Sequence, residues 1–326
     1  MSDILKIEDL VIQYDTDSGC VHALNGLSLT LREGETLGLV GETGAGKTTL
    51  ARSIMGLIQC PPGKIVSGKI LYRGEDLLTM KEKHRQSIRG KEISMIFQEL
   101  CLVPDMSVAE NIFIGREPKI GKTGIVDRKK LIRQTQELLD SFEITFLRPT
   151  DSLRGMSTAK MQMIEICKAL SYHSKLIIMD EPTSSLTEDE CKTLFRIVER
   201  LKRNGITFIF ISHKMDEIKR IADDITIMRD GTYVGTWPAA ELSTDQIIAK
   251  MVGRELTNVY PPKENKPGEV IMEVKDLCSI HEKSFQHVSF ELRKGEILGF
   301  GGLVGAQRTE LMEGIFGIRG IASGEI

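Results

Sequence analysis

Hydrophobic and polar positions along the chain follow two different periods, which predict both strands and helices. Strict alternation predicts strands with one buried face at residues 4–14 and 21–31. Short, nearly continuous apolar runs predict strands buried on both faces, as parallel strands are, at residues 37–40, 91–97, 175–180 and 206–211. Helical spacing of apolar residues predicts helices at residues 128–142, 156–170, 190–203, 215–221 and 244–251. The alternation of the two kinds of pattern predicts an α/β fold with a mixed, largely parallel sheet.

One of the buried runs leads directly into a glycine-rich loop and a helical pattern. Its glycines and the pair Lys47-Thr48 fit the pattern G-x-x-x-x-G-K-[ST] of a P-loop NTPase. Glycines let successive backbone amides approach phosphate oxygens at a helix N-terminus. Lys47 is then expected on the β- and γ-phosphates of ATP, and the Thr48 hydroxyl on Mg²⁺. The motif assigns to nucleotide binding Gly41, Glu42, Thr43, Gly44, Ala45, Gly46, Lys47, Thr48 and Thr49.

The two alternating strands that precede the loop predict an antiparallel β-subdomain. Such a subdomain can cover the adenine side of a nucleotide, and Tyr14 is the aromatic residue best placed to stack on the base. A half-buried tyrosine of a strand is the structural alternative.

Polar residues follow three of the predicted buried strands at their carboxyl ends. Gln98 ends the first, Asp180 and Glu181 the second, and His213 the third. In an α/β sheet the carboxyl ends of the strands border the crevice in which ligands bind. We expect Gln98, Thr48 and Asp180 around Mg²⁺, Glu181 as the residue that orients or deprotonates water, and His213 at the γ-phosphate. Taken alone, the Asp-Glu pair could begin a helix, and the histidine could be structural.

Composition narrows the class of protein further. The net charge is −3, from 43 Lys plus Arg and 46 Asp plus Glu, so no basic field indicates a nucleic-acid partner. Six scattered cysteines lack zinc-type spacing and are expected to be reduced cytosolic thiols. Neither a signal peptide nor a long apolar stretch is predicted.

The beginning of the chain repeats near its end. Residues 271–277 and 288–299 echo residues 5–10 and 27–38, after a linker-like stretch rich in proline and lysine. In the second copy Gln307 and Arg308 take the places of Gly46 and Lys47, so its loop is degenerate. The expected domains are residues 1–254, with a helical insertion at about 101–172; a linker, 255–268; and a partial second copy, 269–326.

The order of these motifs resembles that of an ABC-transporter ATP-binding subunit. In that family a signature at the start of a helix binds the γ-phosphate of the nucleotide on a partner domain. The matching stretch begins at Met156 and keeps Ser157, whereas both glycines and the glutamine of the usual Leu-Ser-Gly-Gly-Gln differ. The resemblance implies ATP hydrolysis with Mg²⁺, with Ser157 in the nucleotide site.

The duplicated ATPase with a degenerate second loop is similar to the monosaccharide importers of this family. Residues 53–57, 61–68 and 93–98 are instead reminiscent of dipeptide and oligopeptide importers. The sugar-importer resemblance implies integral membrane permease subunits, a second ATPase domain or second chain, and indirectly an extracytoplasmic sugar-binding protein. It places the chain at the cytoplasmic face of the membrane, C-terminally truncated in its second ATPase domain.

Two other interpretations belong to different classes. A soluble ABC ATPase of translation or DNA repair is disfavoured by the near-neutral charge and by the lack of a long coiled-coil or arginine-rich insertion. A nucleotide-binding remnant with little turnover is the non-enzymatic alternative.

Overall fold

The computed structural model describes residues 2–17, 19–253, 265–303 and 305–326. The chain forms two compact units: unit 1 comprises residues 1–255 and unit 2 comprises residues 256–326. Most of the expected linker lies outside the described residues. Within the described ranges no helix is both long and apolar enough to cross a membrane.

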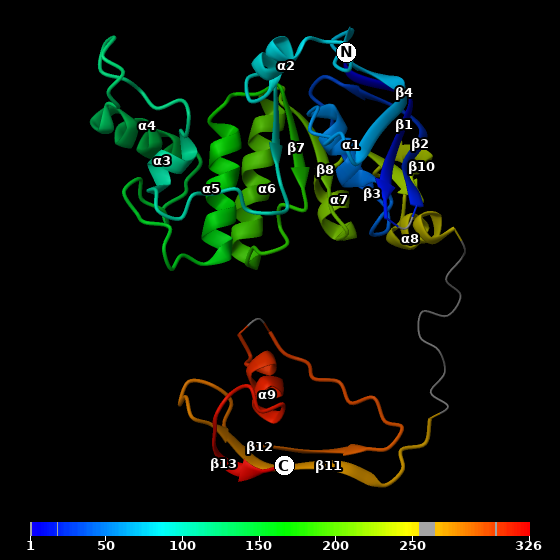
Figure 1. Cartoon of the computed structure of the whole chain (residues 1–326), viewed down its shortest axis with the longest axis vertical. Coiled ribbons are helices and arrows are strands. Elements are labelled where there is room, and N and C mark those ends of the chain that lie inside the picture. The colour runs from blue at the N-terminus through cyan, green and yellow to red at the C-terminus, as the bar shows by residue number, and fades with distance from the viewer. Residues whose placement is uncertain (1, 18, 254–264, 304) are drawn as a thin grey trace. The chain divides into compact units, whose positions relative to one another are not determined.

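The centre of unit 1 is a six-stranded sheet whose core strands are parallel (Figure 1). Its order is β10-β9-β3-β8-β7-β6, and all neighbours are parallel except β10 and β9. The strands are β3 (Thr36–Val40), β6 (Ile93–Ile96), β7 (Leu176–Asp180), β8 (Thr207–Ile211), β9 (Asp224–Arg229) and β10 (Thr232–Pro238). The sequence analysis did not predict β10.

Both faces of this sheet are buried, which explains the continuous apolar runs. Phe208 and Phe210 of β8 pack into one cluster of core residues, whereas Ile209 and Ile211 pack into the other. Strands covered on both sides need apolar residues at every position. The mixed, largely parallel sheet predicted from these runs is confirmed.

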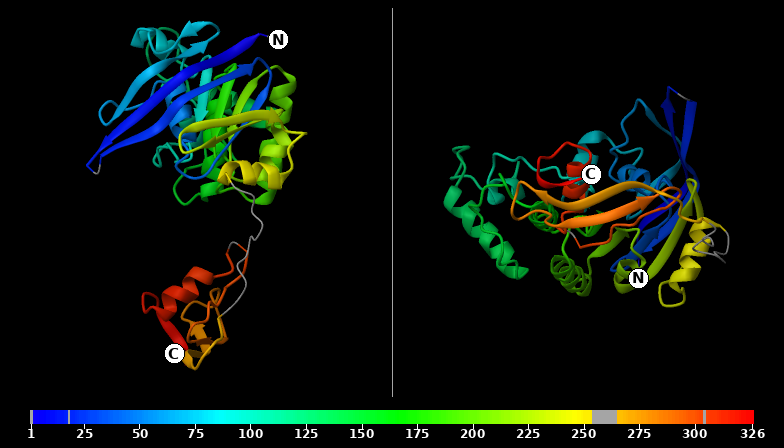
Figure 2. Two further views of the ribbon diagram at one scale, coloured as in Figure 1. Left: turned by 90° about the vertical axis from the view of Figure 1, so that its right-hand side faces the viewer. Right: turned by 90° about the horizontal axis from the view of Figure 1, so that it is seen from below.

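One face is covered by the antiparallel subdomain and the helix after the glycine loop. The subdomain has the order β2-β1-β4-β5, and its long strands β1 and β2 lie side by side (Figure 2). The elements on this face are β1 (Asp3–Thr16), β2 (Gly19–Arg32), β4 (Gly63–Tyr72), β5 (Glu75–Asp76) and α1 (Lys47–Ile54). The predicted N-terminal β-subdomain is confirmed.

Helices cover the opposite face, and α5 and α6 stand next to β7 (Figure 1). Local capping fixes where several begin: Ser107, Thr187 and Ser243 form capping boxes at α3, α6 and α8. The remaining helices of unit 1 are α2 (Glu82–Ile88), α3 (Val108–Ile112), α4 (Arg128–Ser141), α5 (Thr158–Leu170), α6 (Glu188–Arg203), α7 (Met215–Ile221) and α8 (Thr244–Val252). The short helix α2 was not predicted.

The described part of unit 2 contains a three-stranded antiparallel sheet, ordered β12-β11-β13, and one helix. Its elements are β11 (Val270–Ser279), β12 (Val288–Arg293), α9 (Arg308–Ile315) and β13 (Ile321–Glu325). Residues 296–300, which echo β3, are not a strand in unit 2. In unit 1 β3 is held between β8 and β9, and the described part of unit 2 contains no counterparts of these two strands.

Candidate functional site

The glycine-rich loop connects β3 to α1, as its pattern predicts. Gly46 stands at the N-cap of α1 with φ of 93°, in the left-handed region that favours glycine. A Cβ on Gly46 would lie 2.4 Å from the carbonyl oxygen of Ala23, and one on Gly41 would lie 2.4 Å from that of Met228. Both positions therefore require glycine for steric reasons.

Lys47 closes the loop on itself. Its ammonium group donates to the carbonyl oxygens of Gly41, at 2.8 Å, and of Glu42, at 2.9 Å. Burial lowers the pKa of Lys47, while the charges of Glu181 and Asp180 act in the opposite direction. A cation that is only 8% exposed and faces two carboxylates makes this loop a site for an anionic ligand.

Asp180 ends β7 directly behind the loop. Asp180 is 2% exposed, and the neighbouring Thr48 hydroxyl favours its charged form. Burial raises the pKa of Asp180, although Thr48 and Lys47 partly oppose this. Asp180, Thr48 and Gln98 line a cavity of about 570 Å³.

A chain of hydrogen bonds connects the carboxyl ends of three strands. Gln98 Nε2 donates to Glu181 Oε2 at 3.0 Å, and His213 Nδ1 lies 3.1 Å from Glu181 Oε1. Glu181 has φ of 47°, an uncommon conformation for a residue with a side chain, and its amide donates to the carbonyl of Ile211. Residues from three separate segments thus meet at one carboxylate, as the strand-end argument predicts.

The two remaining predicted residues occupy different surroundings. Tyr14 on β1 is half-buried and lines the same cavity as Thr48 and Gln98. Ser157 caps α5, where its hydroxyl accepts from the amide of Lys160 at 3.4 Å. Among the described residues, Ser157 makes no hydrogen bond to the cluster around Glu181.

A buried network beside the site was not foreseen. Glu217 on α7 accepts from the Thr183 hydroxyl at 2.7 Å and from the Ser212 hydroxyl at 3.0 Å. Its other oxygen lies 3.1 Å from the Lys214 ammonium group. The network ties the segment after Glu181 to the segment that carries His213. Ser212, a polar residue directly before His213, was the only signal in the sequence for this network.

We expect a Glu217→Gln variant to lose both stability and turnover. Buried groups that lose a charged partner cost about 1–3 kcal/mol of unfolding free energy. Turnover should fall by about tenfold while KM for ATP changes little, since misplaced catalytic groups slow the chemical step. Steady-state kinetics and thermal denaturation check both effects, and Glu137→Gln, at an exposed position on α4, is the control. Unchanged kcat in a destabilised variant would reduce Glu217 to a structural residue.

An Asp180→Asn variant should be more stable than the parent when no nucleotide is present. Because burial raises the pKa of Asp180, its charged form costs stability above the folded pKa. This cost disappears as pH falls below the ordinary value of 3.8, so the gain in Tm should shrink as pH is lowered. Calorimetry across pH checks this, with Asp189→Asn, at an exposed position, as the control. A Tm below that of the parent at neutral pH would contradict the expectation.

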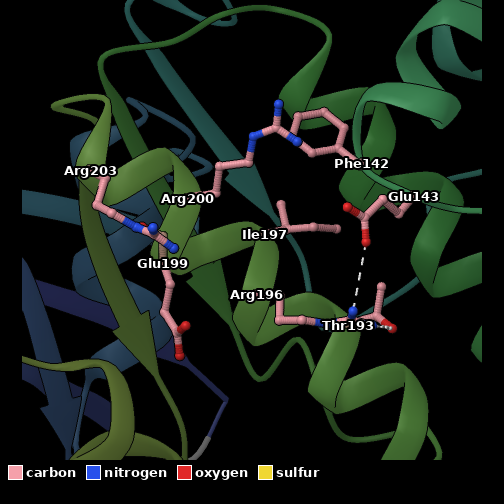
Figure 3. Close-up of a pocket in the computed structure, with 8 residues that line it drawn as sticks. All are labelled: Phe142, Glu143, Thr193, Arg196, Ile197, Glu199, Arg200 and Arg203. Atoms are coloured by element: carbon pink, nitrogen blue, oxygen red, sulfur yellow. Dashed lines mark hydrogen bonds and ion pairs between the residues drawn. The ribbon is translucent and has the colours of Figure 1, made fainter.

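A second hollow, of about 340 Å³, lies between α6 and the end of α4 (Figure 3). Its three arginines already have partners. Arg196 pairs with Glu143 at 3.7 Å, Arg200 donates to the carbonyl of Ser141, and Arg203 donates to the carbonyl of Glu199 at 3.3 Å. The contacts of Arg196 and Arg200 connect α6 to the end of α4, whereas that of Arg203 stays within α6. None of the lining residues belongs to the glycine-loop site.

Comparison with known proteins agrees with this geometry. The ABC transporter family profile matches residues 24–184, a span that contains the glycine loop, Gln98, Ser157, Asp180 and Glu181. A solved dimeric ATP-binding cassette bound to ADP and phosphate has a TM-score of 0.63 at 20% identity, over 72% of this chain and 98% of its own. Unit 1 has the ATP-binding cassette fold. A nucleotide-free cassette has the same TM-score at 23% identity, over 80% of this chain and all of its own.

Curated relatives share the sequence over most of its length. A galactose/methyl galactoside import ATP-binding protein of Clostridium tetani is 51% identical over 94% of this chain and 59% of its own length. A putative ribose/galactose/methyl galactoside import ATP-binding protein of Halalkalibacterium halodurans is 49% identical over 94% and 56%. The Escherichia coli galactose/methyl galactoside import ATP-binding protein is 45% identical over 94% and 58%. The chain therefore spans less than two thirds of the length of these relatives.

Proposed function

We propose that this protein binds and hydrolyses ATP to power the import of a sugar of the galactose or ribose type. The observation that carries the proposal is the convergence of Gln98 and His213 on the two oxygens of Glu181, beside the loop of Lys47. Identity of 51% to a galactose/methyl galactoside import protein supports the sugar class over the peptide class.

In the proposed site the phosphates of ATP lie on the loop from Gly41 to Thr49, with Lys47 at the β- and γ-phosphates. Tyr14 stacks on adenine. Glu181 orients or deprotonates the attacking water, and His213 holds the γ-phosphate. In the absence of nucleotide, the hydrogen bonds of the Lys47 ammonium group to its own loop keep the cation in place for an anion.

The residues around Asp180 fit a magnesium ion. The Thr48 hydroxyl, the Asp180 carboxylate and the Gln98 amide are oxygen donors, which Mg²⁺ prefers. Gln98 uses its amide nitrogen toward Glu181, which leaves the amide oxygen for a ligand. When bound, the ion would neutralise charge that develops on the phosphates.

A second ATPase domain, in this chain or in another copy, is proposed to complete the site. Ser157 makes no bond to the cluster in its own unit among the described residues, which fits a role at the nucleotide of a partner. The similarity to a dimeric cassette supports this arrangement. Closure of two domains would exclude water from the reacting phosphate.

The proposed partners are integral permease subunits and, through them, an extracytoplasmic sugar-binding protein. The protein would act as a peripheral subunit at the cytoplasmic face of the membrane. The boundaries predicted for the domains and the truncation of the second ATPase domain remain predictions.

Transport assays test the proposal. The chain is co-purified with the permease encoded by its neighbouring genes and reconstituted into vesicles with the matching binding protein. ATP-dependent uptake of labelled galactose or ribose is expected. Uptake of a dipeptide instead would move the chain to the peptide class. Tight ATP binding without turnover in the complete assembly would indicate a nucleotide-binding remnant, and co-purification with ribosomes or DNA a soluble ATPase.

A further inference from the structure

Unit 2 contains a cluster of metal-ligating side chains that the ATPase chemistry does not use. Asp276, Cys278 and His287 each offer one ligand atom, and the three atoms lie within 4.8 Å of one another. Asp276 and Cys278 belong to β11, and His287 directly precedes β12. We propose that these three residues bind a divalent transition-metal ion, with Zn²⁺ as the occupant.

The distances between the donor atoms suit a tetrahedral ion. His287 Nδ1 lies 2.8 Å from Asp276 Oδ1 and 3.8 Å from Cys278 Sγ. Zinc bonds of about 2.0–2.3 Å in tetrahedral geometry place neighbouring donors about 3.3–3.6 Å apart. Small movements of side chains therefore suffice. Asp276 and His287 are exposed, so a water molecule can fill the fourth position.

The same geometry excludes a catalytic triad. In a triad the histidine uses one ring nitrogen for the nucleophile and the other for the carboxylate. Here Nδ1 faces both Cys278 and Asp276. Because His287 Nδ1 faces both the Cys278 thiol and the Asp276 carboxylate, the three donor atoms are arranged as ligands around a common centre are.

The backbone of β11 bends at Asp276, and the first copy of the repeat has the same bend at Asp9 in β1. Asp9 and Asp276 have φ of 46° and 48°, and their amides donate to Ser28 and Ser289, both at 2.9 Å. Gly68 and Gly324 meet the equivalent backbone atoms beside this bend. The two copies therefore build the same irregularity in the same way.

Only unit 2 carries the soft ligands at this bend. By the register of the repeat, Val11 takes the place of Cys278, and Gly26 takes the place of His287. Gly26 has φ of 71° and His287 has φ of 54°, a left-handed conformation that is uncommon for residues other than glycine. The first copy shows that the fold needs neither the thiol nor the imidazole.

The chemistry of the donors selects the ion. Thiolate and imidazole ligands suit Zn²⁺ and related transition metals, whereas Mg²⁺ prefers oxygen ligands. This site is therefore distinct in selectivity from the one proposed around Asp180. Bound metal would join β11 to the segment before β12. The buried core of the described part of unit 2 is small, consisting of Val274, Leu277, Phe285 and Leu311, and a metal crosslink adds most stability where the core is small.

Cobalt titration of the full chain tests the proposal. Metal-free protein without nucleotide is titrated with Co²⁺, and a thiolate-to-cobalt charge-transfer band is expected that Zn²⁺ removes and Mg²⁺ does not. The variants Cys278→Val and His287→Gly carry the residues of the first copy, which fit the same bend. Cys278→Val should abolish the band, and His287→Gly should weaken Co²⁺ binding at least tenfold.

The control removes the exposed thiols outside the cluster, as Cys20→Ser, Cys60→Ser and Cys101→Ser together. This triple variant should keep the band and its affinity. A band that survives Cys278→Val or disappears in the triple variant overturns the proposal. X-ray absorption at the zinc edge of the parent chain needs no variant. One sulfur with two or three nitrogen or oxygen neighbours is expected, and a shell without sulfur overturns the site.

Discussion

Replacing Glu181 by glutamine is expected to reduce ATP turnover by about 10²–10³-fold, because a positioned general base contributes a factor of this size. Glutamine keeps the size of the side chain and can still bond to Gln98 or His213, but it cannot accept a proton from water. Binding of ATP should be retained, since the loop around Lys47 is unchanged. The kinetics of phosphate release and equilibrium ATP binding, measured on the assembled transporter, separate the two effects.

Glu188→Gln is the matched control for this experiment. Glu188 begins α6 a few residues beyond Glu181, is exposed and pairs only with Lys192 among the described residues. ATP turnover of the Glu188→Gln variant should equal that of the parent. Turnover of Glu181→Gln at the parental rate would remove Glu181 from the role of base and would leave Asp180 as the nearest carboxylate to the loop.

The second large effect is expected for Lys47→Ala. The ammonium group donates to two carbonyl oxygens of its own loop and, in the proposed site, contacts the phosphates of ATP, so its loss removes both a charge and the closure of the loop. Hydrogen bonds to charged groups contribute about 1.5–3 kcal/mol each, which predicts a loss of ATP affinity of about 10–100-fold. Isothermal titration calorimetry with ATP and Mg²⁺ measures it.

The repeat provides the control, because Arg308 occupies the position of Lys47 in the degenerate second loop. Arg308→Ala should leave ATP affinity unchanged. If both variants lose affinity equally, the second loop takes part in binding and its assignment as degenerate is wrong. If neither loses affinity, the glycine loop of unit 1 is not the nucleotide site.

Much of the fold was predictable because each element carries a local signal. The double-sided burial of β7 and β8 requires continuous apolar runs, and the glycines of the loop are required by the carbonyl oxygens of Ala23 and Met228. The positions of Gln98, Glu181 and His213 after the carboxyl ends of strands were sufficient to predict that they lie close together, because parallel strands end at one edge of the sheet.

Other features depended on contacts that no local pattern reveals. The strand β10 is an antiparallel edge strand, and its pairing with β9 was not visible in a search for buried runs. The segment at residues 296–300 has the composition of a strand but no neighbours to bond with among the described residues. An apolar segment therefore does not form a strand where the tertiary partners are missing.

The cluster around Glu217 and the cluster around Cys278 were both missed in the sequence analysis. In each, the members come from different secondary-structure elements or loops. Glu217 of α7 contacts Thr183, which follows β7, and Cys278 of β11 contacts His287, which directly precedes β12. A search for paired cysteine or histidine spacings does not detect a site with one residue of each kind. Such sites become visible only when the register of neighbouring strands is known.

Both carboxylate oxygens of Glu181 have a partner within unit 1, one the amide of Gln98 and one the imidazole of His213. An acceptor that is already engaged on both sides is a weak base for a third donor. Gln98 stands where the helical insertion begins, so a movement of that insertion would free one oxygen. In the proposed site, such a movement would couple the position of the insertion to the ability of Glu181 to accept a proton from water.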